Sequence, residues 1–139
     1  EVAYPGSADR CDLCIGDADG WDWALEIKAA RAMRDNGSPA PEHLKEMLSP
    51  YRSDRSLIGD ATKVLRFGPA VRRAILVYGY DYPDHPLADL LPALRSLLEL
   101  RVAILHEAEA PFDGLVHPVH RRGRVIAWEV AQRPGGDRG

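Results

Sequence analysis

Two carboxylic acids and a lysine near the start of the chain have the types and spacing of a hydrolytic metal site. Asp12 lies in a short apolar run, and Glu26 and Lys28 follow in a segment that alternates between apolar and polar residues. Side chains two positions apart on a β-strand project from one face, so Glu26 and Lys28 are expected side by side. Carboxylates hold hard cations such as Mg²⁺, which can activate water against a phosphate ester. The residues therefore favour metal-assisted phosphodiester hydrolysis.

The elements that position these residues are predicted to be the two strands of a β-hairpin. Residues 21–29 alternate with a period of two, which indicates a strand. Residues 10–16 form the other strand, and a turn cluster at 17–20 joins the two. A tight turn of this kind brings Asp12 alongside Glu26.

The two faces of the second strand differ in character. Its apolar face carries Trp21, Trp23, Leu25, Ile27 and Ala29. We expect this apolar face to pack against the core, which leaves the opposite face for chemistry. The competing interpretation is an ordinary polar strand face with a cross-strand ion pair to Asp12, of the kind that contributes little to stability.

The middle of the chain predicts a helix followed by a buried strand. Residues 54–67 carry apolar side chains at helical spacing, and Ser53 or Asp54 is suited to cap the start. Residues 74–78 are continuously apolar, which is typical of a central strand covered on both faces. Residues 43–48 indicate a short helical turn.

The last third of the chain predicts a helix, a strand and a closing hairpin. The helix is expected at residues 86–100 and the strand at 102–106. The hairpin joins residues 115–120 to residues 124–131, and Pro118 directs its first strand to an edge or a bulge.

This order of elements predicts a mixed α/β domain. Residues 1–132 form the domain and residues 133–139 a flexible tail or linker. The helix at 54–67 is a crossover connection if the strands on either side of it are parallel. Because the chain opens on Glu1 and closes on a tail, we expect it to be part of a longer protein.

The motif of Asp12 followed by Glu26-Ile27-Lys28 resembles the PD-(D/E)XK motif of restriction-endonuclease-like nucleases, and the order of elements matches through about Tyr80. The resemblance implies a mixed sheet flanked by helices, here with an added C-terminal strand and hairpin. It also implies a Mg²⁺ ion, for which Mn²⁺ substitutes, bound by Asp12, Glu26 and the Ile27 carbonyl, with Lys28 as the catalytic lysine.

The chain departs from that family in two places. Cys11 stands where the motif has proline, at a position that varies across the superfamily. The family core also begins with a helix that can carry a glutamate, and residues 1–9 are too short to form it. That helix is either replaced or lies upstream.

Several further residues are candidates for accessory roles, each with a plainer alternative. The accessory candidates are Asp22, Asp60, Lys63 and His120, and the candidates for nucleic-acid contact are Arg121, Arg122 and Arg124. The plainer alternative for Asp22 is a solvated residue near the turn. For Asp60 and Lys63 it is a place on the solvated side of a helix. His120, with His117, serves either a structural role or a phosphate or base contact, and the arginines are otherwise an exposed turn.

The net charge, the cysteine count and the distribution of apolar residues limit the classes of function that the chain can have. The formal net charge of −3 argues against a domain that grips nucleic acid by bulk charge alone. Cys11 and Cys14 are too few for a disulfide framework and form only a weak zinc motif, so buried structural cysteine is the interpretation. The lack of a long apolar stretch or a secretory signal favours a soluble, cytoplasmic protein.

The sequence therefore predicts a metal-dependent nuclease that acts on nucleic acid, with DNA favoured over RNA. A cleavage domain of a bacterial defence or repair system is the expected setting, either as a homodimer or within a larger protein or complex. The alternative is a catalytically inactive nucleic-acid-binding or oligomerisation module on the same fold.

Overall fold

The computed structural model describes residues 2–51 and 55–135, and a five-stranded mixed sheet dominates these residues. The strands are β1 (Val2–Ala3), β2 (Arg10–Cys11), β3 (Leu13–Asp17), β4 (Gly20–Ala30), β5 (Arg72–Tyr80), β6 (Val102–Phe112) and β7 (Gly123–Gln132). The helices are α1 (Pro41–Met47), α2 (Leu57–Val64), the 3₁₀-helix η1 (Leu87–Asp89) and α3 (Leu91–Glu99). The predicted mixed α/β class is confirmed.

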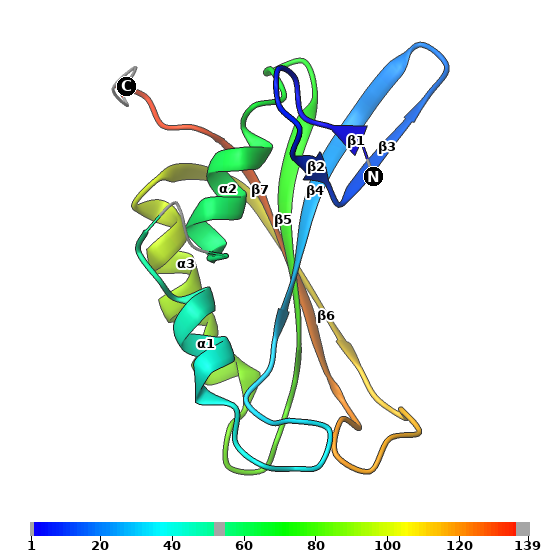
Figure 1. The fold of residues 1–139 in the computed structure, drawn as a ribbon, viewed down its shortest axis with the longest axis vertical. Coiled ribbons are helices and arrows are strands. Elements are labelled where there is room, and N and C mark those ends of the chain that lie inside the picture. Colours follow the sequence, from blue (N-terminus) through cyan, green and yellow to red (C-terminus); the bar gives the residue numbers. More distant parts are fainter. Residues whose placement is uncertain (1, 52–54, 136–139) are drawn as a thin grey trace.

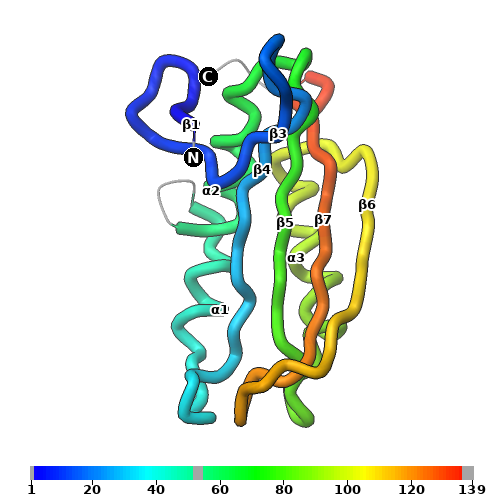
Figure 2. Tube along the Cα trace, turned by 90° about the vertical axis from the view of Figure 1, so that its right-hand side faces the viewer, coloured from blue at the N-terminus to red at the C-terminus, as the bar shows by residue number. Residues whose placement is uncertain are grey.

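The sheet has the order β3-β4-β5-β7-β6, and β1 pairs with β2 in a small sheet of its own (Figures 1 and 2). β3 and β4 form the predicted antiparallel hairpin, with Leu13 opposite Leu25. β4 and β5 are parallel, with Glu26 opposite Ile75, so α1 and α2 lie in a crossover connection. β7 is antiparallel to both of its neighbours, β5 and β6.

Helices and sheet enclose one hydrophobic core. Within the described residues, α1, α2 and α3 lie along one face of the sheet, which we call the covered face (Figure 1). The sheet contributes Ala24, Ile75, Val77, Ile126 and Trp128 to the core, and the helices contribute Leu57, Ala61, Val64, Leu94 and Leu98. Burial of each large side chain stabilises the fold by about 1.5–3 kcal/mol.

The prediction that the tryptophan-bearing side of β4 packs on the core is wrong. Trp21 and Ile27 are 42% and 36% exposed, whereas Ala24 and Glu26 are buried. Parallel strands are joined almost without exception by right-handed crossovers, and this rule sets the face that the connecting helices cover. Connectivity therefore overrides the hydrophobic pattern of β4, and the acid lies under the helices.

The opposite side of the sheet, which we call the open face, is correspondingly apolar. Leu76 and Tyr78 of β5 are only half-buried, so the prediction of a strand covered on both faces is also wrong. Trp23 pairs with Ile15 on this face, and Ile15 is 49% exposed.

The C-terminal hairpin differs from the predicted one. β6 runs to Phe112 instead of ending at His106, and it is β6 that pairs with β7. Residues 113–122 form a loop, in which the Leu115 amide donates to the Arg121 carbonyl over 3.1 Å. Pro118 lacks an amide proton, which favours this loop over the predicted strand.

The helices begin where local capping allows. α2 starts at Leu57 because the Ser56 hydroxyl accepts a hydrogen bond from the Gly59 amide over 3.1 Å. The predicted caps, Ser53 and Asp54, lie outside the described residues. The predicted helix at 86–100 is divided into η1 and α3.

Cys11 is buried, as predicted for a structural cysteine, whereas Cys14 is only half-buried. β7 ends at Gln132, and the predicted tail beyond residue 135 lies outside the described residues. Cys11 and Cys14 are free thiols, and the Cys11 Sγ donates to the Leu25 carbonyl over 3.2 Å. Among the described helices, none combines the length and apolar character needed to cross a membrane.

Candidate functional site

β4 presents Glu26 and Lys28 on the covered face, as neighbours two residues apart. The Glu26 side chain is only 4% exposed. The Lys28 ammonium lies 2.8 Å from the Asp60 carboxylate and donates to the Arg55 carbonyl over 3.0 Å. These contacts hold the lysine against the start of α2.

Asp12 lies between β2 and β3, at the edge of β4 where pairing with β3 has ended. Its Oδ2 accepts a hydrogen bond from the Ile27 amide over 2.8 Å. In an antiparallel strand, the amide and carbonyl of one residue point to the same edge, so the Ile27 carbonyl points toward Asp12 as well. The hairpin thus places Asp12 next to the Glu26-Ile27-Lys28 segment, as the sequence predicted.

Helix α2 adds the two accessory residues that the sequence singled out on it. Lys63 Nζ lies 3.8 Å from Glu26 Oε2 and 3.3 Å from Asp60 Oδ1. Asp60 and Lys63 are three positions apart on the helix and therefore share its sheet-facing side. We call Asp12, Glu26, Lys28, Asp60 and Lys63 the acid–lysine cluster.

Tyr4 completes the surroundings of Glu26, and sequence reasoning missed it. Its hydroxyl donates a hydrogen bond to Glu26 Oε1, and its ring is buried against Phe67 at a centroid distance of 5.3 Å. Burial, followed by the Glu26 carboxylate, raises the pKa of Tyr4, so the phenol remains a donor. Tyr4 directly follows the two-residue strand β1, where a single tyrosine gives no periodic signal, so only the fold reveals this contact.

Electrostatics at the cluster centre on Glu26. Burial raises the pKa of the Glu26 carboxyl to about 7, and the nearby Asp12 and Asp60 charges add to the rise. The Tyr4 hydrogen bond and the Lys63 charge act in the opposite direction. Burial alone would lower the pKa of Lys63, but the Glu26 and Asp60 charges raise it.

A divalent cation suits this set of donors. When ionised, the cluster holds three carboxylates against two ammonium groups, and one of the carboxylates is desolvated. A cation would offset the burial penalty and the carboxylate repulsion that together raise the pKa of Glu26. Asp12, Glu26 and the Ile27 carbonyl are the oxygen ligands that Mg²⁺ or Mn²⁺ prefers.

The structure does not bring the other predicted site residues to the cluster. Asp22 is exposed near the hairpin turn. His120 lies in the loop 113–122, where it contacts Arg31 and Asp35, because that segment is a loop and not a strand. Arg121 and Arg122 are exposed in the same loop.

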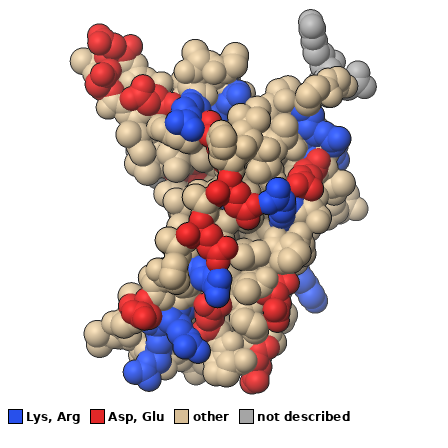
Figure 3. All heavy atoms as spheres, turned by 180° about the vertical axis from the view of Figure 1, so that it is seen from behind, with Lys and Arg blue, Asp and Glu red and all other residues tan. Residues whose placement is uncertain are grey.

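Arg124 is likewise engaged elsewhere, at the start of β7. It pairs with Glu109, and its Nε lies 3.6 Å from an Asp81 carboxylate oxygen. On the face that Figure 3 draws, acidic and basic side chains are interleaved. This distribution agrees with the small net charge of the whole chain.

Residues around His120 form a second polar group, which we call the loop cluster: Arg31, Asp35, Tyr82, His117 and His120. It lies beyond the C-terminal ends of β4 and β5. The sequence offered one signal for it, the two histidines three positions apart. The partner Asp35 comes from a distant loop, which no local pattern indicates.

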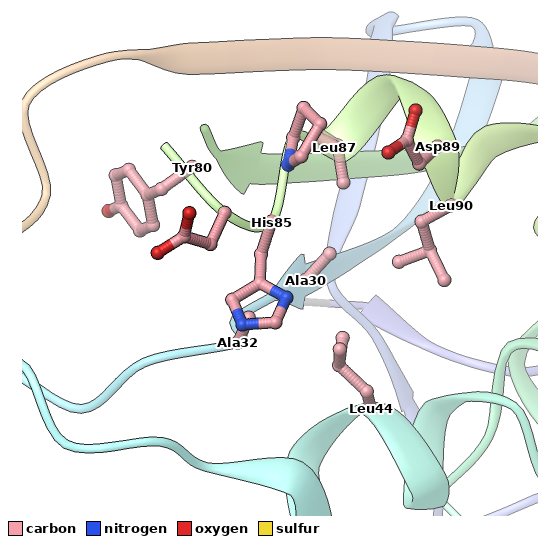
Figure 4. A pocket seen from close by; sticks show the side chains of 10 residues that line it. Ala30, Ala32, Leu44, Tyr80, His85, Leu87, Asp89 and Leu90 are labelled. Atoms are coloured by element: carbon pink, nitrogen blue, oxygen red, sulfur yellow. The ribbon is translucent and has the colours of Figure 1, made fainter. Parts of the chain in front are cut away.

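A pocket of about 230 Å³ opens at the same end of the sheet (Figure 4). Ala30, Leu44 and Leu90 give it an apolar lining, and His85 and Asp89 add polar groups. In parallel α/β sheets, ligands commonly bind beyond the C-terminal ends of the strands. The acid–lysine cluster instead lies nearer the middle of β4, before its C-terminal end.

Comparison with known proteins gives no match: no family model, no curated protein and no solved structure matches the chain. The function is therefore inferred from the geometry of the site.

Proposed function

We propose that this chain is a metal-dependent nuclease with a restriction-endonuclease-like core and that the acid–lysine cluster is its active site. One observation carries the proposal: a buried carboxylate, Glu26, lies beside Asp12 at a strand edge with Lys28 on the same face. The antiparallel hairpin β3–β4 and the parallel strand β5 give this motif the setting that the family resemblance implies.

Asp12, Glu26 and the Ile27 carbonyl would hold Mg²⁺, with Mn²⁺ as a substitute. Such an ion lowers the pKa of a bound water and offsets the charge of the attacked phosphate. Glu26 is suited to bind a metal ion because burial raises the pKa of its carboxyl group. A bound cation would restore the charged form of this group.

Lys28 is the group that would act on the phosphate or on the attacking water. Its ammonium is fixed by Asp60 and by the Arg55 carbonyl, so it is oriented before any substrate binds. A preorganised donor of this kind stabilises charge that develops in the transition state. Asp60 is thus a positioning residue, and Lys63 balances the charge of Glu26.

DNA is the proposed substrate, and a bacterial defence or repair system is the proposed setting. On the face that Figure 3 draws, the interleaved charges form no broad basic surface for the nucleic-acid backbone, and the net charge of the chain is −3. Recognition in this proposal therefore depends on local contacts or on partner domains, and affinity falls steeply with salt only if several phosphates are contacted.

The test is cleavage of plasmid and linear DNA with Mg²⁺ or Mn²⁺, with and without EDTA. Glu26→Gln keeps the size of the side chain and an acceptor for Tyr4 but removes the charge. We expect it to lose at least about 100-fold in rate, whereas Glu99→Gln on α3 retains activity. Metal-dependent cleavage by the Glu26→Gln protein would refute the assignment.

A second candidate function, an oligomerisation module, is favoured by the open face. Ile15, Trp23 and Leu25 line a groove of about 310 Å³ on this face, and Arg72 stacks over Trp23 at 4.0 Å. Exposed apolar patches of this kind mark interaction surfaces. A monomer at all accessible concentrations by light scattering, with metal-dependent cleavage, excludes this candidate.

A further inference from the structure

The loop cluster brings together three side chains with metal-binding atoms, of which Asp35 is distant in sequence from the two histidines. Asp35, His117 and His120 each offer one ligand atom, and these atoms lie within 4.8 Å of one another. Among the described residues, no other group of three or more histidine, cysteine or carboxylate side chains comes together in this way. It joins the loop after β4 to the loop before β7.

His120 is fixed in the orientation that a metal ligand requires. Its ring is buried between the rings of Tyr80 and His117, at centroid distances of 4.5 Å and 4.6 Å. Its Nδ1 lies 2.8 Å from the Tyr82 hydroxyl, and its Nε2 lies 2.9 Å from Asp35 Oδ1. Metal-ligating histidines usually hydrogen-bond through the other ring nitrogen in this way, which fixes ring and tautomer.

A positive group already occupies the position between the imidazole and the carboxylate. Arg31 Nη2 lies 2.9 Å from His120 Nε2 and also pairs with Asp35. The guanidinium only donates and the Asp35 carboxylate only accepts, so these two neighbours make opposite demands on Nε2, whereas a metal ion would bind the lone pairs of both Nε2 and the carboxylate. Arg31 is one-third exposed, so it can swing out and leave Nε2 and Asp35 Oδ1 to a cation.

Of the three side chains, His117 would have to change its hydrogen bonds most to bind a metal ion. Its Nδ1 accepts hydrogen bonds from the Val119 and His120 amides over 3.1 Å and 3.0 Å. In this arrangement Nε2 carries the proton, so coordination exchanges the two amide contacts for one metal bond. The exchange is confined to the loop 113–122, where His117 is only half-buried.

We propose that Asp35, His117 and His120 form a second metal site, which takes a divalent first-row transition ion such as Zn²⁺. Imidazole nitrogens favour Zn²⁺, Ni²⁺ or Cu²⁺ over Mg²⁺, so this site differs in metal type from the acid–lysine cluster. Three protein ligands leave a fourth position of a tetrahedral ion open to water. The bound ion links the loops 31–40 and 113–122, and this inference does not depend on the nuclease activity.

The test is isothermal titration calorimetry of the metal-free full chain with ZnCl₂. We expect one Zn²⁺ per chain and an affinity that falls at least about tenfold in Asp35→Asn and His117→Ala. His43→Ala on α1 is the matched control and leaves the affinity unchanged. Glu26→Gln also leaves it unchanged, so loss of cleavage and loss of zinc binding are distinguishable.

Arg31→Ala should change the zinc affinity in the opposite direction to Asp35→Asn and His117→Ala, because it removes the guanidinium that competes with zinc for His120 and Asp35. We expect it to tighten zinc binding at least severalfold. Zinc binding that survives His117→Ala, an equal loss in His43→Ala, or weaker binding in Arg31→Ala would overturn the proposal. Circular dichroism of each variant separates these outcomes from misfolding, and the exposed Asp35 side chain makes Asp35→Asn the safest variant.

Discussion

The two faces of the sheet distribute polarity in opposite ways. On the covered face, Glu26 and Lys28 lie among the helices, and Glu26 is almost fully buried. On the open face, Ile15 and Ile27 remain substantially exposed. For β4, a fold that only maximised stability would reverse this assignment, because burial of charge is costly and burial of apolar surface is favourable. The polar residues on the covered side of β4 are those that the proposed active site requires.

Lys28→Gln gives the largest expected effect on the covered face. The variant removes the ammonium group that Asp60 and the Arg55 carbonyl orient, so cleavage should fall about 100- to 1000-fold. Lys45→Gln on α1 controls for the loss of one positive charge. Single-turnover rates measured at saturating Mg²⁺ check the prediction, and equal rates for the two variants would contradict it.

Ile75→Ala tests how much the covered face contributes to stability. Ile75 is fully buried opposite Glu26, so truncation should lower the free energy of unfolding by about 2–5 kcal/mol. Urea denaturation followed by circular dichroism measures the change. A loss of less than 1 kcal/mol would mean that the helices do not pack on this face.

Glu26→Gln tests the energetic penalty of the buried acid. The folded pKa of about 7 lies above the ordinary value of 4.5, so the folded state holds a proton that the unfolded state has lost between these values. Stability of the metal-free protein should therefore fall as pH rises from about 4.5 to 7 and level off above that range.

The glutamine variant lacks this titration and should be about 3 kcal/mol more stable than the parent at pH 8, with little difference at pH 4. Urea midpoints over this pH range provide the measurement. If the stability of both proteins changed with pH in the same way, Glu26 would be solvated. The covered face would then carry no buried acid to contrast with the exposed apolar residues of the open face.

Ile15→Ala gives the smallest expected effect and is the matched partner of Ile75→Ala. Ile15 is half-exposed on the open face, so its truncation should cost less than about 1 kcal/mol in the isolated chain. If Ile15→Ala lowered the free energy of unfolding as much as Ile75→Ala does under the same conditions, the open face would have to be covered in solution.

Much of the framework was accessible from the sequence because it depends on local patterns. The alternation around Glu26 predicted β4, the turn cluster predicted the β3–β4 hairpin, and helical spacing predicted α2. The convergence of Asp12, Glu26 and Lys28 followed from these elements. Asp60 and Lys63 were accessible as candidates because they share the polar side of a predicted helix.

Other features depend on contacts between distant segments. The choice of covered face follows from the crossover between β4 and β5, which the alternation within β4 does not encode. The contact from Tyr4 to Glu26 and the meeting of Asp35 with His120 join separate segments without a periodic signal. Pro118 pointed to an edge strand, whereas the chain forms a loop held by amide contacts to His117.

The position of β7 between β5 and β6 has a consequence for how the protein is made. β7 is the last strand that the structure describes, yet it is an interior strand of the sheet, and it supplies the buried Ile126 and Trp128. During synthesis, β6 leaves the ribosome before the strand that joins it to β5. The sheet is therefore completed only when residues near 130 emerge, and a chain that terminates before Gly123 lacks the strand that joins β6 to β5.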